Sequence, residues 1–318
     1  MAFFLHFCAL EKHKSILRCR LPTSTSPQIA NLIILFMAQS KTKKIAAISM
    51  VRNDNFFVHK WIKYYGAILG LKNLYLVIDG YDQSLPEKHE LINIIQKEHT
   101  PMKRARGDRY RARLVSGIAQ NLFNEYDIVI AHDIDEYLVA DPDCGQSLAE
   151  YLQKPFSTSS VSALGLDVGQ HREKESAIDP SQPFLKQRSY AHVSARYTKA
   201  IVATRPITWG SGYHRVKGKN FTIDPNLFLF HFGMVDLEMC KKKTEQSELN
   251  KSGWSGHFNR RFQLFNLILK QKAFPGDDFF PIARKRQSLF RPIFALNKPG
   301  MLREKPIIKI PDRFKNII

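Results

Sequence analysis

A short acidic stretch, Asp133-Ile134-Asp135-Glu136, closes the apolar run DIVIAHDI of residues 127–134. Carboxylates that directly follow a buried strand lie in a tight turn at the edge of a sheet. Hard cations such as Mg²⁺ or Mn²⁺ are held by one or two carboxylates together with phosphate oxygens of a substrate. Such a metal neutralises charge that develops on a departing diphosphate. The stretch therefore predicts a site for Mn²⁺ or Mg²⁺, the alternative being a solvated strand end with helix-capping acids.

A second group of residues suits phosphate. Residues 103–113 (KRARGDRYRAR) hold six basic side chains around an expected helix start. The N-terminus of a helix favours anions, and arginines grip phosphate with two hydrogen bonds. Arg109 and Arg113 lie four residues apart on one helix face, so we expect them to bind a nucleotide diphosphate. A solvated basic face is the alternative interpretation.

The elements that must position these residues alternate along the first half of the chain. The pattern predicts strands at 44–51, 73–79 and 127–134, with helices from a cap at Asn53 or Asp54 to Leu69, at 86–98, and from a cap at Asp108. This order indicates an α/β fold with a Rossmann-like, mostly parallel central sheet flanked by helices. Ligands of such sheets bind beyond the carboxyl ends of the strands, where Asn53, Asp79 and Asp133 fall.

The rest of the chain is less regular. We expect strands at 161–166, 200–204 and 227–231, helices at 235–249 and 258–270, and no clear period in 272–318. The predicted organisation is an N-terminal extension (1–43), a catalytic domain (44–256) and a basic C-terminal extension (257–318). Residues 2–10 and 29–38 are apolar but too short to span a membrane. Met37 is the predicted true start, and a weak amphipathic membrane anchor is the alternative.

Composition narrows the class of protein. The chain is 44% hydrophobic and carries a net charge of +19, which favours anionic partners such as nucleotides, nucleic acid or a membrane surface. Residues 257–318 hold 14 lysines and arginines against 4 acids, more than half of that charge. The four cysteines lack zinc, redox or disulfide spacing, which favours a reduced cytoplasmic setting.

Four segments, in this order, resemble the family-2-type glycosyltransferases of the GT-A fold, in the bacterial branch with a D-x-D-E-[FY]-L motif. They are SMVRNDNFFVHKWIKYYGAILG, LYLVIDGYD, IVIAHDIDEYLV and LFLFHFG, within residues 44–250. The resemblance implies a GT-A-like fold and transfer of a sugar from a nucleotide-sugar donor to a hydroxyl acceptor, such as a surface glycan or a lipid-linked precursor.

The resemblance also implies roles for individual residues. Arg52 and Asn53 would contact the nucleotide, and Asp79 the base or ribose. Asp133 and Asp135 would hold the metal and the sugar diphosphate. A histidine often completes the metal shell, and His231 fits this role best, with His214 as the second candidate. Taken alone, Asp79-Gly80 is equally a turn signal, and a lone histidine in an apolar strand, such as His231, is more often a hydrogen-bonded core residue than a metal ligand.

An inverting transferase also needs a carboxylate that takes the proton of the acceptor hydroxyl. Asp167, expected to close the strand at 161–166, is the first candidate for this base. Asp224 and Asp236 flank the strand that carries His231 and are the alternatives.

The leading hypothesis is a cytoplasmic, metal-dependent, inverting glycosyltransferase. A further hypothesis is that its basic C-terminal region holds it peripherally at the inner face of an anionic cell membrane. A nucleic-acid-binding protein would also explain the charge, but zinc, RNA-recognition and basic-zipper signatures are missing from the sequence, so no specific nucleic acid is expected. A phosphotransferase with Asp133 as nucleophile is a third hypothesis, but such enzymes place Asp-x-Asp after the first strand.

Overall fold

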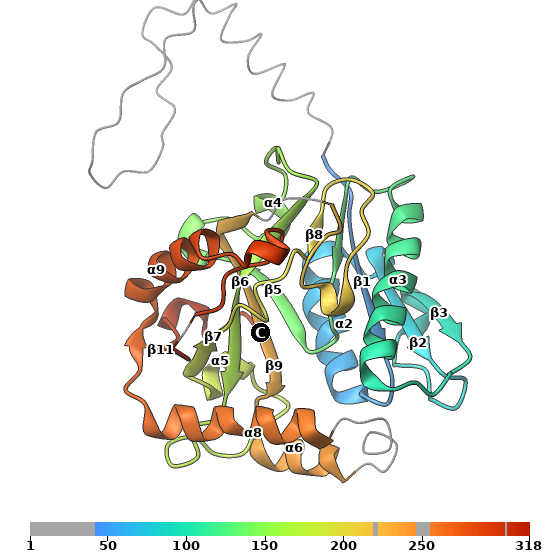
Figure 1. The fold of residues 1–318 in the computed structure, drawn as a ribbon. Coiled ribbons are helices and arrows are strands. Elements are labelled where there is room, and N and C mark those ends of the chain that lie inside the picture. Colours follow the sequence, from blue (N-terminus) through green and yellow to red (C-terminus); the bar gives the residue numbers. More distant parts are fainter. Residues whose placement is uncertain (1–41, 219–221, 246–254, 303) are drawn as a thin grey trace, which may run out of the picture. The chain divides into compact units, whose positions relative to one another are not determined.

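The computed structural model describes residues 42–218, 222–245, 255–302 and 304–318. Residues Lys43–Ile318 form one compact unit, built on a sheet in the order β10-β11-β7-β6-β8-β4-β1-β2-β3, with β5 paired to β9 and β9 to β6 (Figure 1). The strands are β1 (Ile45–Val51), β2 (Leu74–Asp79), β3 (Asn93–Lys97), β4 (Ile128–Ala131), β5 (Glu136–Ala140), β6 (Ser160–Gly169), β7 (Tyr190–Val193), β8 (Val202–Ala203), β9 (Ile223–Met234), β10 (Phe274–Pro275) and β11 (Ile307–Lys309). The helices are α2 (Asn55–Leu69), α3 (Arg104–Leu122), α4 (Leu148–Tyr151), α5 (Phe184–Gln187), α6 (Leu237–Thr244), α8 (Ser255–Lys270) and α9 (Gly276–Leu289).

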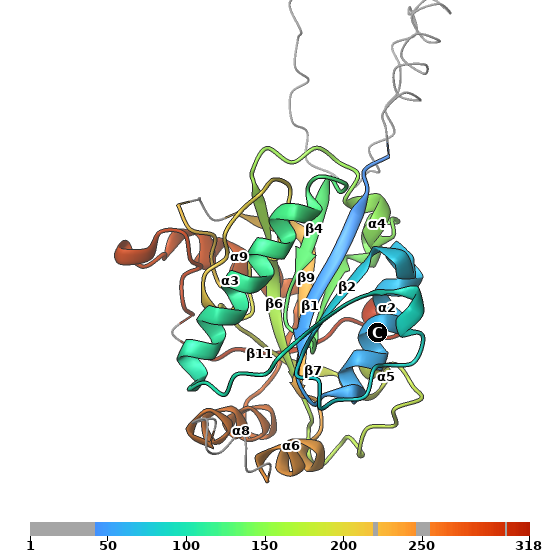
Figure 2. The ribbon, with the colours of Figure 1, turned by 90° about the vertical axis from the view of Figure 1, so that its right-hand side faces the viewer.

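The predicted α/β class is confirmed. Strands β4, β1, β2 and β3 run parallel to one another, and β6 runs parallel to β9. Every residue of β1 is buried, because parallel strands are covered on both faces and must be apolar throughout. The chain crosses from β1 to β2 through α2 and returns from β3 to β4 through α3. Right-handed crossovers in opposite directions place the two helices on either side of β1 (Figure 1 and Figure 2).

The helix predicted from residue 53 or 54 to Leu69 is confirmed as α2. Its apolar face buries Phe57, Trp61 and Tyr65 at helical spacing. The helix ends where Gly70 adopts a φ of 85°, a conformation that costs glycine little.

Two helix predictions are wrong. Residues 86–98 form a short 3₁₀ turn followed by β3, because β-branched residues of the segment complete a sheet edge along β2. Asp108 does not cap α3, which begins at Arg104. The residue lies one turn inside the helix and pairs with Arg104 at 3.2 Å and Arg111 at 3.5 Å.

Two of the three later strands extend past their predicted limits, whereas the strand predicted at 200–204 is shortened to β8. β6 continues to Gly169, so Asp167 lies within the strand and does not close it. β9 covers residues 223–234 and therefore contains both Asp224 and His231. Both strands are longer because they pair with each other over most of their length. The predicted helix at 235–249 is observed as α6, which starts at Leu237, and residues 246–254 lie outside the described residues.

Residues 272–318 are more regular than their sequence suggests. β11 pairs with β7, and the ring of Phe314 packs against Phe228 and Phe230 with centroids 5.2 and 5.3 Å apart. The tail therefore contributes to the core of the same compact unit. The predicted start at Met37 lies outside the described residues. Within the described part of the chain, no helix is both long enough and apolar enough to cross a membrane.

Candidate active site

The acidic stretch forms the corner between β4 and β5, at the carboxyl end of the parallel strands. The backbone N–H of Glu136 donates to the carbonyl of Asp133 at 3.1 Å, which closes the turn. Ser49 at the neighbouring position of β1 donates to the carbonyl of His132 at 2.9 Å. The chain then enters β5 directly, so the two aspartates of the turn are held between two buried strands.

Asp133 is held by two cations. Arg111 donates to one carboxylate oxygen at 2.7 Å, and Lys199 to the other at 2.8 Å. Lys199 is 1% exposed and also pairs with the buried Glu136 at 2.5 Å. Burial opposes ionisation of Asp133, but the charges of Lys199 and Arg111 outweigh it and lower its pKa. Asp133 therefore stays ionised and fixes the position of Arg111 at the rim of the site.

His231 lies between two other carboxylates. Its Nδ1 is 2.8 Å from Asp167, and its Nε2 is 3.3 Å from Asp135. Strand pairing sets this arrangement, because His231 of β9 is opposite Glu136 on β5 and opposite Asp167 on β6. Burial favours neutral imidazole, but the two carboxylates raise the pKa of His231 overall.

An aromatic ring and an arginine complete the support of this histidine. The ring of Tyr197 stacks on the imidazole of His231 with centroids 3.9 Å apart. Arg261 of α8 donates to Asp167 at 3.1 Å and also contacts the hydroxyl of Tyr197. The pKa of Asp167 is lowered because the charges of Arg261 and His231 outweigh its burial. His231 is thus oriented by Asp167 of β6 and by Tyr197 of the loop before β8, and Arg261 of α8 supports both of them.

The pair Asp135 and His231 fits a divalent metal. Histidines that bind metals usually hold their other ring nitrogen on a carboxylate, as Asp167 does here. Gly233 leaves the space beside the pair open, since a Cβ there would lie 2.6 Å from the His231 ring and 2.8 Å from an Asp135 oxygen. No group of three or more acidic, histidine or cysteine side chains suited to a metal occurs among the described residues. Two donors suffice for Mn²⁺ or Mg²⁺ when phosphate oxygens and water complete the shell.

The chain matches no family model and no curated protein. Among solved structures it is similar to a mannosyltransferase, PcManGT from Pyrobaculum calidifontis, in complex with GDP-Man and Mn²⁺. The two chains are 13% identical with a TM-score of 0.38, and the match covers 80% of this chain and 76% of the other. Similarity at that level carries no conclusion about the activity of this chain.

The residues expected to contact the nucleotide meet at the ends of β1 and β2. Arg52 donates to the carbonyl of Asp79 at 2.8 Å and forms a bidentate salt bridge with Asp82, with N···O distances of 3.0 and 3.1 Å. The carboxylate of Asp79 binds Lys97 at 2.5 Å and His99 at 3.0 Å. Asn53 adopts a φ of 52°, a left-handed turn that exposes the loop between β1 and α2.

Among the described residues, the other candidates make no direct contact with the carboxylates of the acidic corner. Arg109 and Arg113 share a helix face, as expected, but both are exposed. Burial, then the charge of Lys199, lowers the pKa of His214 to about 3. No hydrogen bond joins His214 to the acidic corner among the described contacts.

Two of the three candidate bases are engaged elsewhere. Asp224, at the opposite end of β9 from His231, accepts hydrogen bonds from Tyr151 at 2.6 Å and Lys154 at 2.7 Å. Asp236 caps α6 and pairs with the buried Arg188 at 3.3 Å. Asp167 is the only one of the three placed beside His231.

Sequence reasoning missed Arg111, Lys199, Arg261 and Lys243. Arg111 could have been found, because it lies beside Ala112 and Val115 on the buried face of α3, about half a turn from Arg109 and Arg113. Lys243 of α6 pairs with Asp54 at 2.7 Å, next to the corner. Lys199 and Arg261 carry no local signal, because only the fold brings them to the carboxylates.

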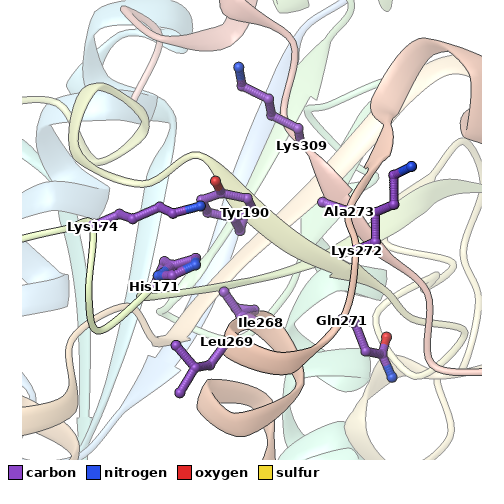
Figure 3. Close-up of a pocket in the computed structure, with 9 residues that line it drawn as sticks. All are labelled: His171, Lys174, Tyr190, Ile268, Leu269, Gln271, Lys272, Ala273 and Lys309. Atoms are coloured by element: carbon purple, nitrogen blue, oxygen red, sulfur yellow. The ribbon is translucent and has the colours of Figure 1, made fainter.

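A separate cavity of about 340 Å³ opens between β7, β11 and α8 (Figure 3). Lys174, Lys272 and Lys309 surround its mouth, and His171 and Tyr190 form one wall. Tyr190 pairs with Gly169, two residues beyond Asp167 on β6, so the cavity adjoins the end of the strand that supports His231.

Proposed function

We propose that this chain is a glycosyltransferase that moves a sugar from a nucleotide-diphosphate sugar to a hydroxyl acceptor with the help of Mn²⁺ or Mg²⁺. The observation that carries the proposal is the Asp135–His231–Asp167 arrangement next to the Arg111–Asp133 ion pair. Two side chains suited to bind a metal and one cation lie at the same strand ends, which supports the proposal. The order of motifs, which resembles family-2-type glycosyltransferases, supports the same activity.

Each side chain then has a defined task. Asp135 and His231 hold the metal, which when bound neutralises charge on the departing diphosphate. Asp133 directs Arg111 toward the diphosphate oxygens, because one of its carboxylate oxygens already holds that guanidinium. Asp167 acts as a positioning residue for His231, and its contacts with Arg261 and His231 leave it poorly suited to receive the acceptor proton.

The nucleoside would bind over the loop that follows β1. Arg52 and Asn53 project from that loop, and Asp79 lies at the end of the adjacent β2. Asp79 acts through Lys97 and His99, which its carboxylate holds in place. We therefore assign Asp79 to the shape and charge of the nucleoside subsite.

The geometry argues against the alternative in which Asp133 is a phosphotransferase nucleophile. A carboxylate nucleophile needs a free oxygen lone pair directed at phosphorus. Both oxygens of Asp133 accept hydrogen bonds from cations, at 2.7 and 2.8 Å, which lowers their nucleophilicity.

The test is a thermal-shift screen of nucleotide-diphosphate sugars with and without MnCl₂, followed by assay of nucleotide diphosphate release. We expect at least one donor to stabilise the wild type only when metal is present. Asp135→Ala and His231→Ala should abolish that response. Asp312→Asn, at an acid exposed in the tail, should retain it. A wild type that no donor stabilises, or a full response in Asp135→Ala, refutes the proposal.

A further inference from the structure

Five large apolar side chains are exposed to solvent at the end of α9 and in the loop that follows it. Their exposed fractions run from 60% to 93%, far above those of core residues. We call them the apolar cluster: Leu289, Phe290, Ile293, Leu296 and Met301. A soluble surface usually scatters such residues singly, so a group of this kind marks a surface that binds something apolar.

The fold holds the cluster together. The N–H of Gly300 donates to the carbonyl of Gln287 at 2.7 Å, which returns the loop to the end of α9. A Cβ at Gly300 would lie 2.3 Å from the carbonyl oxygen of Phe290, so only glycine permits this approach. Met301 is thereby brought next to Phe290. Ala295, in the middle of the same loop, is buried, so the loop is anchored to the fold between the exposed side chains.

The same segment is strongly basic. Residues 279–302 contain five lysines and arginines and no aspartate or glutamate. Lys285 and Arg286 are exposed on the last turns of α9, immediately before Leu289. Apolar side chains therefore lie among positive charges that no acid within the segment compensates.

We propose that the apolar cluster and its basic neighbours dock this protein on an anionic lipid surface. Apolar side chains lower their free energy by entering the boundary between headgroups and acyl chains, while lysine and arginine meet the lipid phosphates. The phosphates of a nucleic acid would pair with the basic side chains, but a nucleic acid offers no apolar environment for Ile293 or Leu296. A second copy of the chain would bring two positive surfaces together, which opposes self-association.

The cluster also lies near the candidate active site. Asn297, in the same loop, donates to the carbonyl of Val216 at 2.9 Å, two residues beyond His214. The charge of Lys298 contributes to the lowered pKa of His214. Docking through this loop would present that end of the site to acceptors at the lipid surface. Binding to a lipid surface requires only the apolar cluster and its basic neighbours and is independent of the proposed transfer reaction.

The experiment is co-sedimentation of the full chain with phosphatidylcholine vesicles that contain about 30% phosphatidylglycerol. We expect binding that weakens in pure phosphatidylcholine and at high salt. The double variant Phe290→Ser/Ile293→Ser should bind about tenfold more weakly or worse, since two side chains lose their apolar contact. Leu91→Ser is the matched control, because Leu91 is 50% exposed beside β3, at the opposite end of the sheet from α9 (Figure 1).

Several results would overturn the proposal. They are a wild type that does not bind anionic vesicles, a double variant that binds them like the wild type, and a Leu91→Ser variant that loses as much vesicle binding as the double variant. A truncated chain that begins at Met37 must bind the vesicles as well as the full chain does. If the truncation abolished binding, residues 1–36 and not the apolar cluster would be responsible for it. Light scattering that shows a wild-type dimer and a monomeric double variant would make a second copy the occupant. Circular dichroism of each variant establishes that it is folded.

Discussion

The Nδ1 atom of His231 lies 2.8 Å from an oxygen of Asp167, and the two residues face each other across the parallel pairing of β9 and β6. Asp167 is ionised and accepts from the Nδ1–H of His231, which leaves Nε2 directed at Asp135, 3.3 Å away. A buried histidine held in this way has one ring nitrogen directed at a carboxylate and suited to share a metal with it.

Asp167→Asn should weaken metal binding without removing either metal donor. Loss of a carboxylate behind a metal-binding histidine typically costs about 10- to 100-fold in affinity. Calorimetric titration of Mn²⁺ in the presence of the nucleotide measures the effect. Asp224→Asn is the matched control, because Asp224 is similarly buried but pairs with Tyr151 and Lys154. Equal losses in the two variants would contradict a positioning role for Asp167.

Gly233→Ala should disrupt the pair formed by Asp135 and His231. The new Cβ would lie 2.6 Å from the His231 ring and 2.8 Å from an Asp135 oxygen, so one of them must move. We expect the metal-dependent stabilisation by a donor to be largely lost. Gly117→Ala serves as the control: Gly117 is exposed on α3 with no atom within 4 Å of the new Cβ, and the change should stabilise the helix by about 0.5–1 kcal/mol. Thermal melts with and without Mn²⁺ distinguish the two.

Arg111→Gln should lower affinity for a nucleotide diphosphate, whereas Arg109→Gln and Arg113→Gln should leave it nearly unchanged. All three substitutions remove one charge from the same helix. Only Arg111 contacts Asp133, and the other two are exposed. Hydrogen bonds between an arginine and an anion contribute about 1.5–3 kcal/mol each, which corresponds to more than tenfold in affinity. Similar losses in all three variants would mean that only the overall charge of α3 matters.

His132 should make the metal-free protein less stable as the pH falls. Burial lowers the pKa of this histidine from 6.5 to about 4. Between those values the unfolded chain binds a proton that the folded chain does not, so stability is complete above pH 6.5 and is lost toward pH 4. The loss from this group amounts to roughly 3 kcal/mol. His132→Phe removes the titration, so urea unfolding at pH 7 and pH 4.5 should show a smaller difference than in the wild type. An unchanged difference would show that His132 is not the responsible group.

Local sequence determined the elements and one part of the site. Apolar runs with β-branched residues predicted β1, β2 and β4, because strands covered on both faces must be apolar throughout. The spacing of aromatic residues and Gly70 predicted α2. Where buried strands end, the next polar residues must lie at the sheet edge, which is why Asp133 and Asp135 could be placed from sequence. The same local logic failed at residues 86–98, where the demand for a partner along β2 outweighed the helical spacing.

Tertiary structure decided which residues meet the carboxylates. His231 faces Asp167 only because β9 and β6 pair in one particular register, and a shift of β9 by one residue would turn His231 to the other face. Lys199 and Arg261 come from distant parts of the chain, and their sequence surroundings resemble any other basic surface. Their role arises because buried carboxylates must be paired with charge, a requirement that exists only once the core has formed. The sequence by itself thus determined where acids would gather, while the packed fold selected the cations, the orientation of the histidine and the division of tasks between Asp133, Asp135 and Asp167.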